Sequence, residues 1–260
     1  MYKYAIRNGS LQCEWKDGLE TAGRLGFDGV ELIIKEEEQL DRLLTDEGRD
    51  EVQGWAKESG AAVSSLSPGL YNGTFKSKAL RGDAETRARC VDFVKRCVRA
   101  CRDVGGAGIL LPYFEREHLD ITADEQAWLV DEMKQCAPTA EECGVTLCLE
   151  TSFSAGQLKA ICEAVGSERV GVYQDLSNAI HFEQEPVATL RALGGHVKLV
   201  HVKDTDQSLL GEGRVDMPGC AAALREIGYS GWMVFETAPQ DDPIASAKKN
   251  LAFAKATFGE

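Results

Sequence analysis

Residues 194–206 read "GGHVKLVHVKDTD", and this stretch contains both the fold signal and the first functional signal. The segment 197–202 is rich in valine and leucine, which is typical of a parallel strand covered on both faces. His201 interrupts that apolar run, and Lys203 and Asp204 follow it. A single histidine in such a strand is usually a core side chain, so the remaining strands must decide its role.

The same succession of apolar strand, loop and amphipathic helix recurs along the whole chain. Most of the helical segments are followed by a glycine, which favours a left-handed cap before the next strand. These glycines are Gly26, Gly60, Gly105, Gly144, Gly166, Gly194 and Gly228. The predicted strands are 2–6, 29–34, 61–67, 107–114, 145–151, 170–175, 197–204 and 231–237.

Strict alternation of strands and helices predicts parallel strands joined by right-handed crossovers. Eight such units in 260 residues fit a (β/α)8 TIM barrel, which takes about 250 residues. An open doubly wound sheet is the alternative, but the turn after the first strand, "RNGSLQ", lacks the glycine-rich phosphate fingerprint. We therefore expect one α/β barrel domain over residues 1–260.

Composition limits the possible partners. The formal net charge of −13 makes nucleic acid and anionic membrane unfavourable partners. No apolar run reaches the roughly 18 residues of a membrane span, and the first residues do not resemble a signal peptide. The nine cysteines contain no CxxC pair, which fits a reducing, cytoplasmic location. A homo-oligomer is compatible with these features.

Four polar side chains stand at the ends of four successive strands, namely Glu150, Asp175, His201 and Glu236. Active sites of TIM barrels form at the carboxyl ends of the strands, so these side chains are expected to converge. Three carboxylates gathered there would repel one another unless a cation bound them. Three oxygen donors and one nitrogen suit a divalent ion, with Mn²⁺ as first choice and Mg²⁺, Co²⁺ or Zn²⁺ as alternatives.

Each of these residues also has a purely structural explanation. A carboxylate at a strand end can cap the following helix or belong to an ion pair, and His201 can be a core residue. For Asp175 or Glu150 alone the structural explanation is preferable. Four such coincidences on consecutive strands are much harder to accept, and the metal site is the better prediction.

The chain resembles the xylose isomerase-like barrel superfamily of sugar isomerases and epimerases, in particular its ketose 3-epimerase branch. The stretches that carry the resemblance are "ILLPYF", "YQDLSNA", "HVKDTD", "LGEGRVD" and "REIGYSGWMVFET". The resemblance implies that Glu150, Asp175, His201 and Glu236 bind one metal ion. It further implies that Glu150 and Glu236 are the catalytic acid and base.

The chain departs from free-sugar epimerases at three positions. Asn178 stands where they have a histidine, Gly156 where they have a glutamate, and Gln207 where they have an arginine. The combination of "DxxN" and "HxKD" is more similar to relatives that act on phosphorylated pentuloses.

Substrate contacts are expected from Asn178, Lys203 and Arg214. The last two flank a glycine-rich loop where this fold often binds phosphate. Equally, Lys203 can pair with Asp204, Arg214 can pair with Asp216, and Asn178 can cap a turn.

The predicted activity is metal-dependent 3-epimerisation of a ketose or ketose phosphate through an enediolate. The same residues would also serve a dehydratase of the inosose or 3-dehydroshikimate type. They would serve an aldose-ketose or keto-acid isomerase such as a hydroxypyruvate isomerase. A non-catalytic sugar-binding subunit is a further alternative. An apurinic endonuclease shares the barrel but needs more histidines than the four present here.

Overall fold

The computed structural model describes residues 1–69, 83–114 and 122–259. Its strands are β1 (Lys3–Arg7), β2 (Gly29–Ile34), β3 (Ala62–Pro68), β4 (Gly108–Tyr113), β5 (Thr146–Thr151), β6 (Val170–Asp175), β7 (Val197–Val202) and β8 (Trp232–Phe235). Its α-helices are α1 (Trp15–Leu25), α2 (Glu37–Leu43), α3 (Asp46–Ser59), α5 (Ala84–Asp103), α6 (Ala123–Cys143), α7 (Ala155–Val165), α8 (Leu176–His181), α9 (Pro186–Leu193), α10 (Met217–Glu226) and α11 (Pro243–Phe258). Two short 3₁₀ helices, η2 (Gly194–His196) and η3 (Thr205–Gln207), flank β7.

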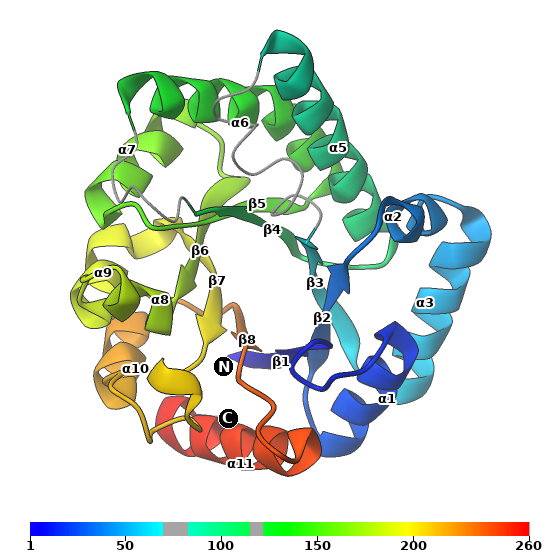
Figure 1. Ribbon diagram of the computed structural model, residues 1–260, viewed down its shortest axis with the longest axis vertical. Coiled ribbons are helices and arrows are strands. Elements are labelled where there is room, and N and C mark those ends of the chain that lie inside the picture. The colour runs from blue at the N-terminus through cyan, green and yellow to red at the C-terminus, as the bar shows by residue number, and fades with distance from the viewer. Residues whose placement is uncertain (70–82, 115–121, 260) are drawn as a thin grey trace.

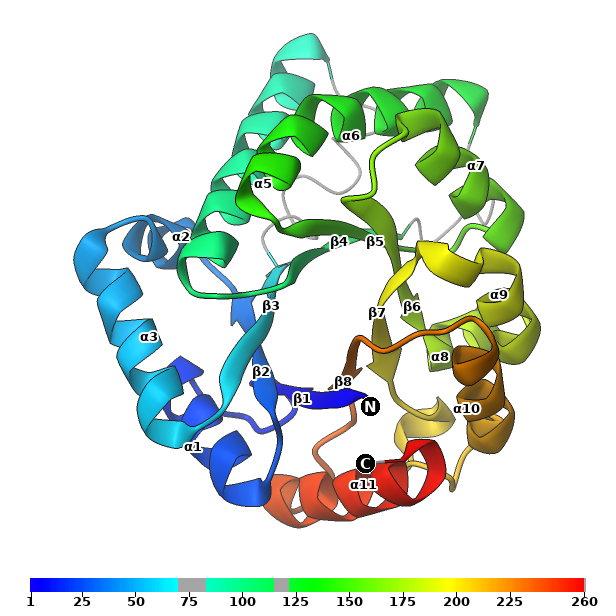
Figure 2. The ribbon, with the colours of Figure 1, turned by 180° about the vertical axis from the view of Figure 1, so that it is seen from behind.

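The strands close into a barrel in the order β1 to β8, and β8 pairs with β1. All neighbouring strands are parallel, and the helices form a ring around them (Figure 1). The same ring is seen from the opposite end in Figure 2. The predicted (β/α)8 barrel is therefore confirmed.

The helix ends follow the local sequence signals. All seven glycines predicted to follow helices have a positive φ. Thr122 and Glu125 form a capping box at the start of α6, and Ser154 and Gln157 form another at the start of α7. Pro243 occupies the first turn of α11. These residues mark where several of the helices begin or end.

Side chains inside the barrel alternate along each strand with a period of two. One interior layer is apolar and consists of Ala5, Leu110, Cys148, Tyr173, Leu199 and Val234. Two residues further along, a polar side chain follows in five of the six cases, namely Arg7, Glu150, Asp175, His201 and Glu236, the last of which lies one residue beyond the end of β8. The strand period thus stacks a charged layer on an apolar one, at the carboxyl end of the barrel.

The strand limits differ slightly from those predicted. β1 ends at Arg7 instead of residue 6, so Arg7 belongs to the sheet. β7 ends at Val202, which places Lys203 and Asp204 in the loop before η3. In the part of the chain that the structure describes, no helix combines the length and the apolar character needed to cross a membrane.

Candidate functional site

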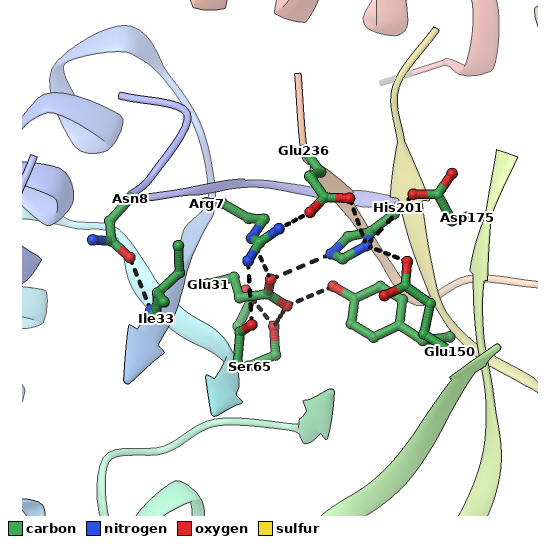
Figure 3. Close-up of polar contacts among 12 residues, drawn as sticks. Arg7, Asn8, Glu31, Ile33, Ser65, Glu150, Asp175, His201 and Glu236 are labelled. Atoms are coloured by element: carbon green, nitrogen blue, oxygen red, sulfur yellow. Dashed lines mark hydrogen bonds and ion pairs between the residues drawn. The ribbon is translucent and has the colours of Figure 1, made fainter. Parts of the chain in front are cut away.

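The four predicted ligands lie together at the carboxyl end of the barrel (Figure 3). One ligand atom from each of Glu150, Asp175, His201 and Glu236 lies within 4.8 Å of the others. His201 Nδ1 is 3.2 Å from Glu150 Oε1, 3.5 Å from Glu236 Oε2 and 3.8 Å from Asp175 Oδ2. Three of the four side chains are buried, whereas that of Glu236 is 24% exposed.

The residues of this cluster fit a divalent cation. Asp175 Oδ1 accepts a hydrogen bond from the backbone N–H of Asn178 at 2.6 Å and so caps α8. Its other oxygen, Oδ2, is buried and meets no hydrogen-bond donor in good geometry among the described residues; its contact there is the ion pair with Lys203. Buried carboxylates are costly unless their charge is balanced, and a divalent cation would supply the positive charge that one lysine cannot supply to three carboxylates. One carboxylate oxygen of Asp175 therefore caps α8, and the other is available to bind a cation.

Lys203 supplies a positive charge to this cluster. Its Nζ lies 2.9 Å from Asp175 Oδ2 and 2.9 Å from Glu236 Oε2. It does not pair with Asp204, because that carboxylate accepts the backbone N–H groups of Gly211, Gly213 and Val215. Lys203 thus offsets part of the negative charge of two of the three clustered carboxylates.

Two residues that were not predicted from the sequence complete the polar layer. Arg7 pairs through Nη1 with Glu236 Oε1, and its Nε lies 3.1 Å from Glu31 Oε1. Glu31 on β2 is fully buried, and its Oε1 lies 3.2 Å from His201 Nε2. The signal for both was available in the sequence, since they occupy interior positions of the first two strands.

The pKa values follow from burial and from these charges. Burial alone would raise the pKa of Glu31, but the charge of His201, its hydrogen bond and Arg7 lower that pKa to about 2. Burial alone would lower the pKa of His201, but Glu31 and Glu150 raise it. Burial and the charge of Glu150 raise the pKa of Asp175, against the effect of Lys203.

A cavity of about 600 Å³ opens above the cluster. Arg7, Asn178, Lys203 and Glu236 line this cavity, together with loop residues from 206 to 208. Arg214 is not among its lining residues; its side chain is 66% exposed and lies 3.6 Å from Asp206. The structure therefore brings Asn178 and Lys203 to the cluster and leaves Arg214 outside.

A family model described as "Xylose isomerase-like TIM barrel" matches residues 19–257. The chain belongs to the xylose isomerase-like TIM barrel family. This match confirms the resemblance inferred from the sequence motifs. The charged layer described above lies at the carboxyl end of the barrel, where TIM-barrel enzymes have their active sites.

Two similar proteins are named as sugar epimerases, and a third was solved with a bound zinc atom. L-ribulose-5-phosphate 3-epimerase UlaE of Escherichia coli is 27% identical over 275 residues, covering 100% of this chain and 94% of that protein. A D-psicose 3-epimerase, crystallised in the presence of D-fructose, superposes with a TM-score of 0.85 at 19% identity, covering 99% of this chain and 100% of that one. The IOLI protein, solved with a bound zinc atom, has a TM-score of 0.80 at 19% identity, covering 99% and 100%. The chain is thus an enzyme of the isomerase and epimerase class.

Proposed function

We propose that this chain is a divalent-metal-dependent 3-epimerase of a ketose or ketose phosphate. The observation that carries the proposal is the convergence of Glu150, Asp175, His201 and Glu236 within 4.8 Å beneath an open cavity. The UlaE relatives, which match the whole chain, support a phosphorylated pentulose, so L-ribulose 5-phosphate is the first substrate to test.

The four clustered residues would hold one divalent ion. When bound, the ion would polarise the substrate carbonyl and stabilise negative charge on its oxygens. Three oxygen donors and one nitrogen favour Mn²⁺, while Mg²⁺ and Co²⁺ are also compatible. The zinc atom in the IOLI protein supports Zn²⁺ as a further alternative.

Glu150 and Glu236 are the proposed acid and base. Epimerisation requires one group to remove the proton from C3 and another to return a proton on the opposite face. Glu236 lines the cavity, and its pairing with Arg7 orients its carboxylate. Glu150 lies deeper, where Asn178 Nδ2 donates to its Oε1 at 3.3 Å.

Three residues are proposed to contact the sugar. Asn178 and Lys203 line the cavity, which supports direct contact with substrate hydroxyls or a phosphate. Arg214 would reach the substrate only if its side chain left Asp206. A cytoplasmic location is supported by the nine free cysteines.

The test begins with metal content. Protein purified without chelator is expected to carry close to one equivalent of divalent metal, and His201→Ala much less. The loaded enzyme is then incubated with L-ribulose 5-phosphate in D₂O. Deuterium should enter at the inverted C3 with the oxygen count unchanged, whereas loss of water would identify a dehydratase. Equal metal content in wild type and His201→Ala would exclude the proposed site.

A further inference from the structure

Glu31 is a fully buried carboxylate at the centre of the barrel, on a strand that contributes none of the proposed metal ligands. Its Oε2 accepts hydrogen bonds from Ser65 Oγ at 2.8 Å and from Tyr173 Oη at 2.7 Å. Its Oε1 lies 3.2 Å from His201 Nε2 and 3.1 Å from Arg7 Nε. Glu31 therefore contacts side chains from four other strands (Figure 3).

The two nitrogens of His201 face different groups. Nδ1 faces Glu150, Asp175 and Glu236, the other three proposed ligands. Nε2 faces Glu31 on the opposite edge of the ring. The ring of Tyr173 packs against the imidazole, with the two ring centroids 4.0 Å apart. In this structure Nδ1 therefore lies on the side of the other three proposed ligands, and Nε2 on the side of Glu31.

A neutral imidazole that binds a metal through one nitrogen keeps its proton on the other. A carboxylate that accepts this proton fixes both the tautomer and the direction of the ring. Glu31 stands where such a carboxylate is needed. Arg7 Nε lies 3.1 Å from the same Glu31 oxygen and places a positive charge beside it.

We propose that Glu31 is a positioning residue for the metal centre. It accepts the Nε2–H of His201 and so holds the tautomer whose Nδ1 lone pair faces Glu150, Asp175 and Glu236. This inference rests on the proposed metal site and adds to it a residue outside the ligand set. A role limited to joining β2, β3 and β6 through Ser65 and Tyr173 is the competing explanation.

Substitutions separate the two explanations through metal affinity. Glu31→Met removes the acceptor at similar length, and Glu31→Gln keeps an acceptor oxygen without the charge. Tyr173→Phe is the matched control, because it removes a hydrogen bond to Glu31 Oε2 and leaves the Oε1 contact with His201. Metal affinity is measured by competition with a chelator, and folding by circular dichroism.

We expect Glu31→Met to weaken metal binding about 10–100-fold, the usual effect of losing such a partner. Glu31→Gln should weaken it less, and Tyr173→Phe should bind metal as the wild type does. Wild-type affinity in both Glu31 variants would overturn the inference while leaving the metal site intact. A wild-type protein that binds no divalent metal would overturn the metal site and this inference together.

A second measurement needs no substitution at Glu31. Wild-type protein with ¹⁵N-labelled histidine is loaded with diamagnetic Zn²⁺ or Mg²⁺, and its four histidines are followed by NMR. The His201 signals are assigned by their loss in His201→Gln. A proton on Nε2 with none on Nδ1 is expected. The opposite tautomer would overturn the inference even if Glu31→Met failed to fold.

Discussion

The ammonium of Lys203 lies 2.9 Å from Asp175 Oδ2, an oxygen that the proposed metal site requires. The same ammonium lies 2.9 Å from Glu236 Oε2, a second proposed ligand atom. Lys203 therefore supplies to these two carboxylates the positive charge that a divalent ion would also supply. Because Lys203 lines the cavity and Asp175 does not, metal entering from the cavity must displace the ammonium.

Lys203→Met is accordingly expected to increase metal affinity, because it removes a competing cation. A partly exposed ion pair contributes on the order of 1 kcal/mol, which corresponds to about a fivefold change in the dissociation constant. The metal-free variant should also unfold at a lower temperature, since Asp175 loses its nearest positive charge. Chelator competition and thermal unfolding measure the two effects.

Lys198→Met is the matched control for that substitution. Lys198 lies near the other end of β7 and contacts Glu168 at 3.8 Å, so the same charge is lost away from the cluster. Weaker metal binding in Lys203→Met than in Lys198→Met would contradict the competition argument.

A phosphate subsite should depend on Lys203 more than on Arg214. Lys203 lines the cavity, whereas Arg214 is exposed beside Asp206. A hydrogen bond to a charged group contributes about 1.5–3 kcal/mol, so Lys203→Met should reduce the preference for a 5-phosphate about tenfold or more. The readout is the ratio of kcat/KM for L-ribulose 5-phosphate to that for L-ribulose, which cancels effects on metal binding. An unchanged ratio in Lys203→Met, with a lower ratio in Arg214→Met, would assign the phosphate to Arg214 instead.

Much of the site could be predicted because strand ends and the period of two are local properties of the sequence. Glu150, Asp175, His201 and Glu236 each follow an apolar interior residue by two positions, as the barrel requires. Arg7 escaped prediction because the first strand was expected to end one residue earlier. Arg7 follows the interior residue Ala5 by two positions, so the same strand period places its side chain inside the barrel.

Glu31 differs from Arg7 in its place on the strand. It lies within the predicted strand 29–34, whereas the four predicted ligands stand at the ends of the last four strands. The partner of Lys203 could not be predicted at all, because it depends on the loop that returns Gly211, Gly213 and Val215 to Asp204. Contacts of this kind join segments that are separate in sequence, and periodicity does not encode them.

A rise in pH should change two properties of the site in opposite directions: the stability of the metal-free protein and its affinity for metal. Burial alone would lower the pKa of His201, but Glu31 and Glu150 raise it above its ordinary value of about 6.5. A raised pKa in the folded state stabilises the metal-free protein fully below about pH 6.5, and that contribution is lost as pH rises through the folded pKa. Metal binding needs an unprotonated Nδ1, so metal affinity should increase over the same pH range.

Thermal unfolding of metal-free wild type and His201→Gln at several pH values isolates the first property. The stability difference between the two should shrink as pH rises from 6 into the alkaline range. Metal titrations at the same pH values measure the second property, and proton release on binding should accompany them. A metal affinity independent of pH in this range would exclude His201 as a ligand.

Glu236→Gln and Glu150→Gln should separate the acid and base of the proposed epimerisation. An amide oxygen can still coordinate metal, but it cannot accept the C3 proton, and each positioned group contributes roughly 10²–10⁴-fold to the rate. Both variants should therefore retain some metal and lose epimerisation. Because Glu150 and Glu236 would act on opposite faces, each variant should still exchange the C3 proton of one epimer with D₂O. The epimer that exchanges should differ between the two variants.

Glu212→Gln is the control, because Glu212 is an exposed carboxylate outside the cavity lining, and this variant should behave as wild type. Exchange of both epimers at wild-type rates in Glu236→Gln would leave Glu236 as a ligand only, and the base would then have to be sought among the other side chains that line the cavity.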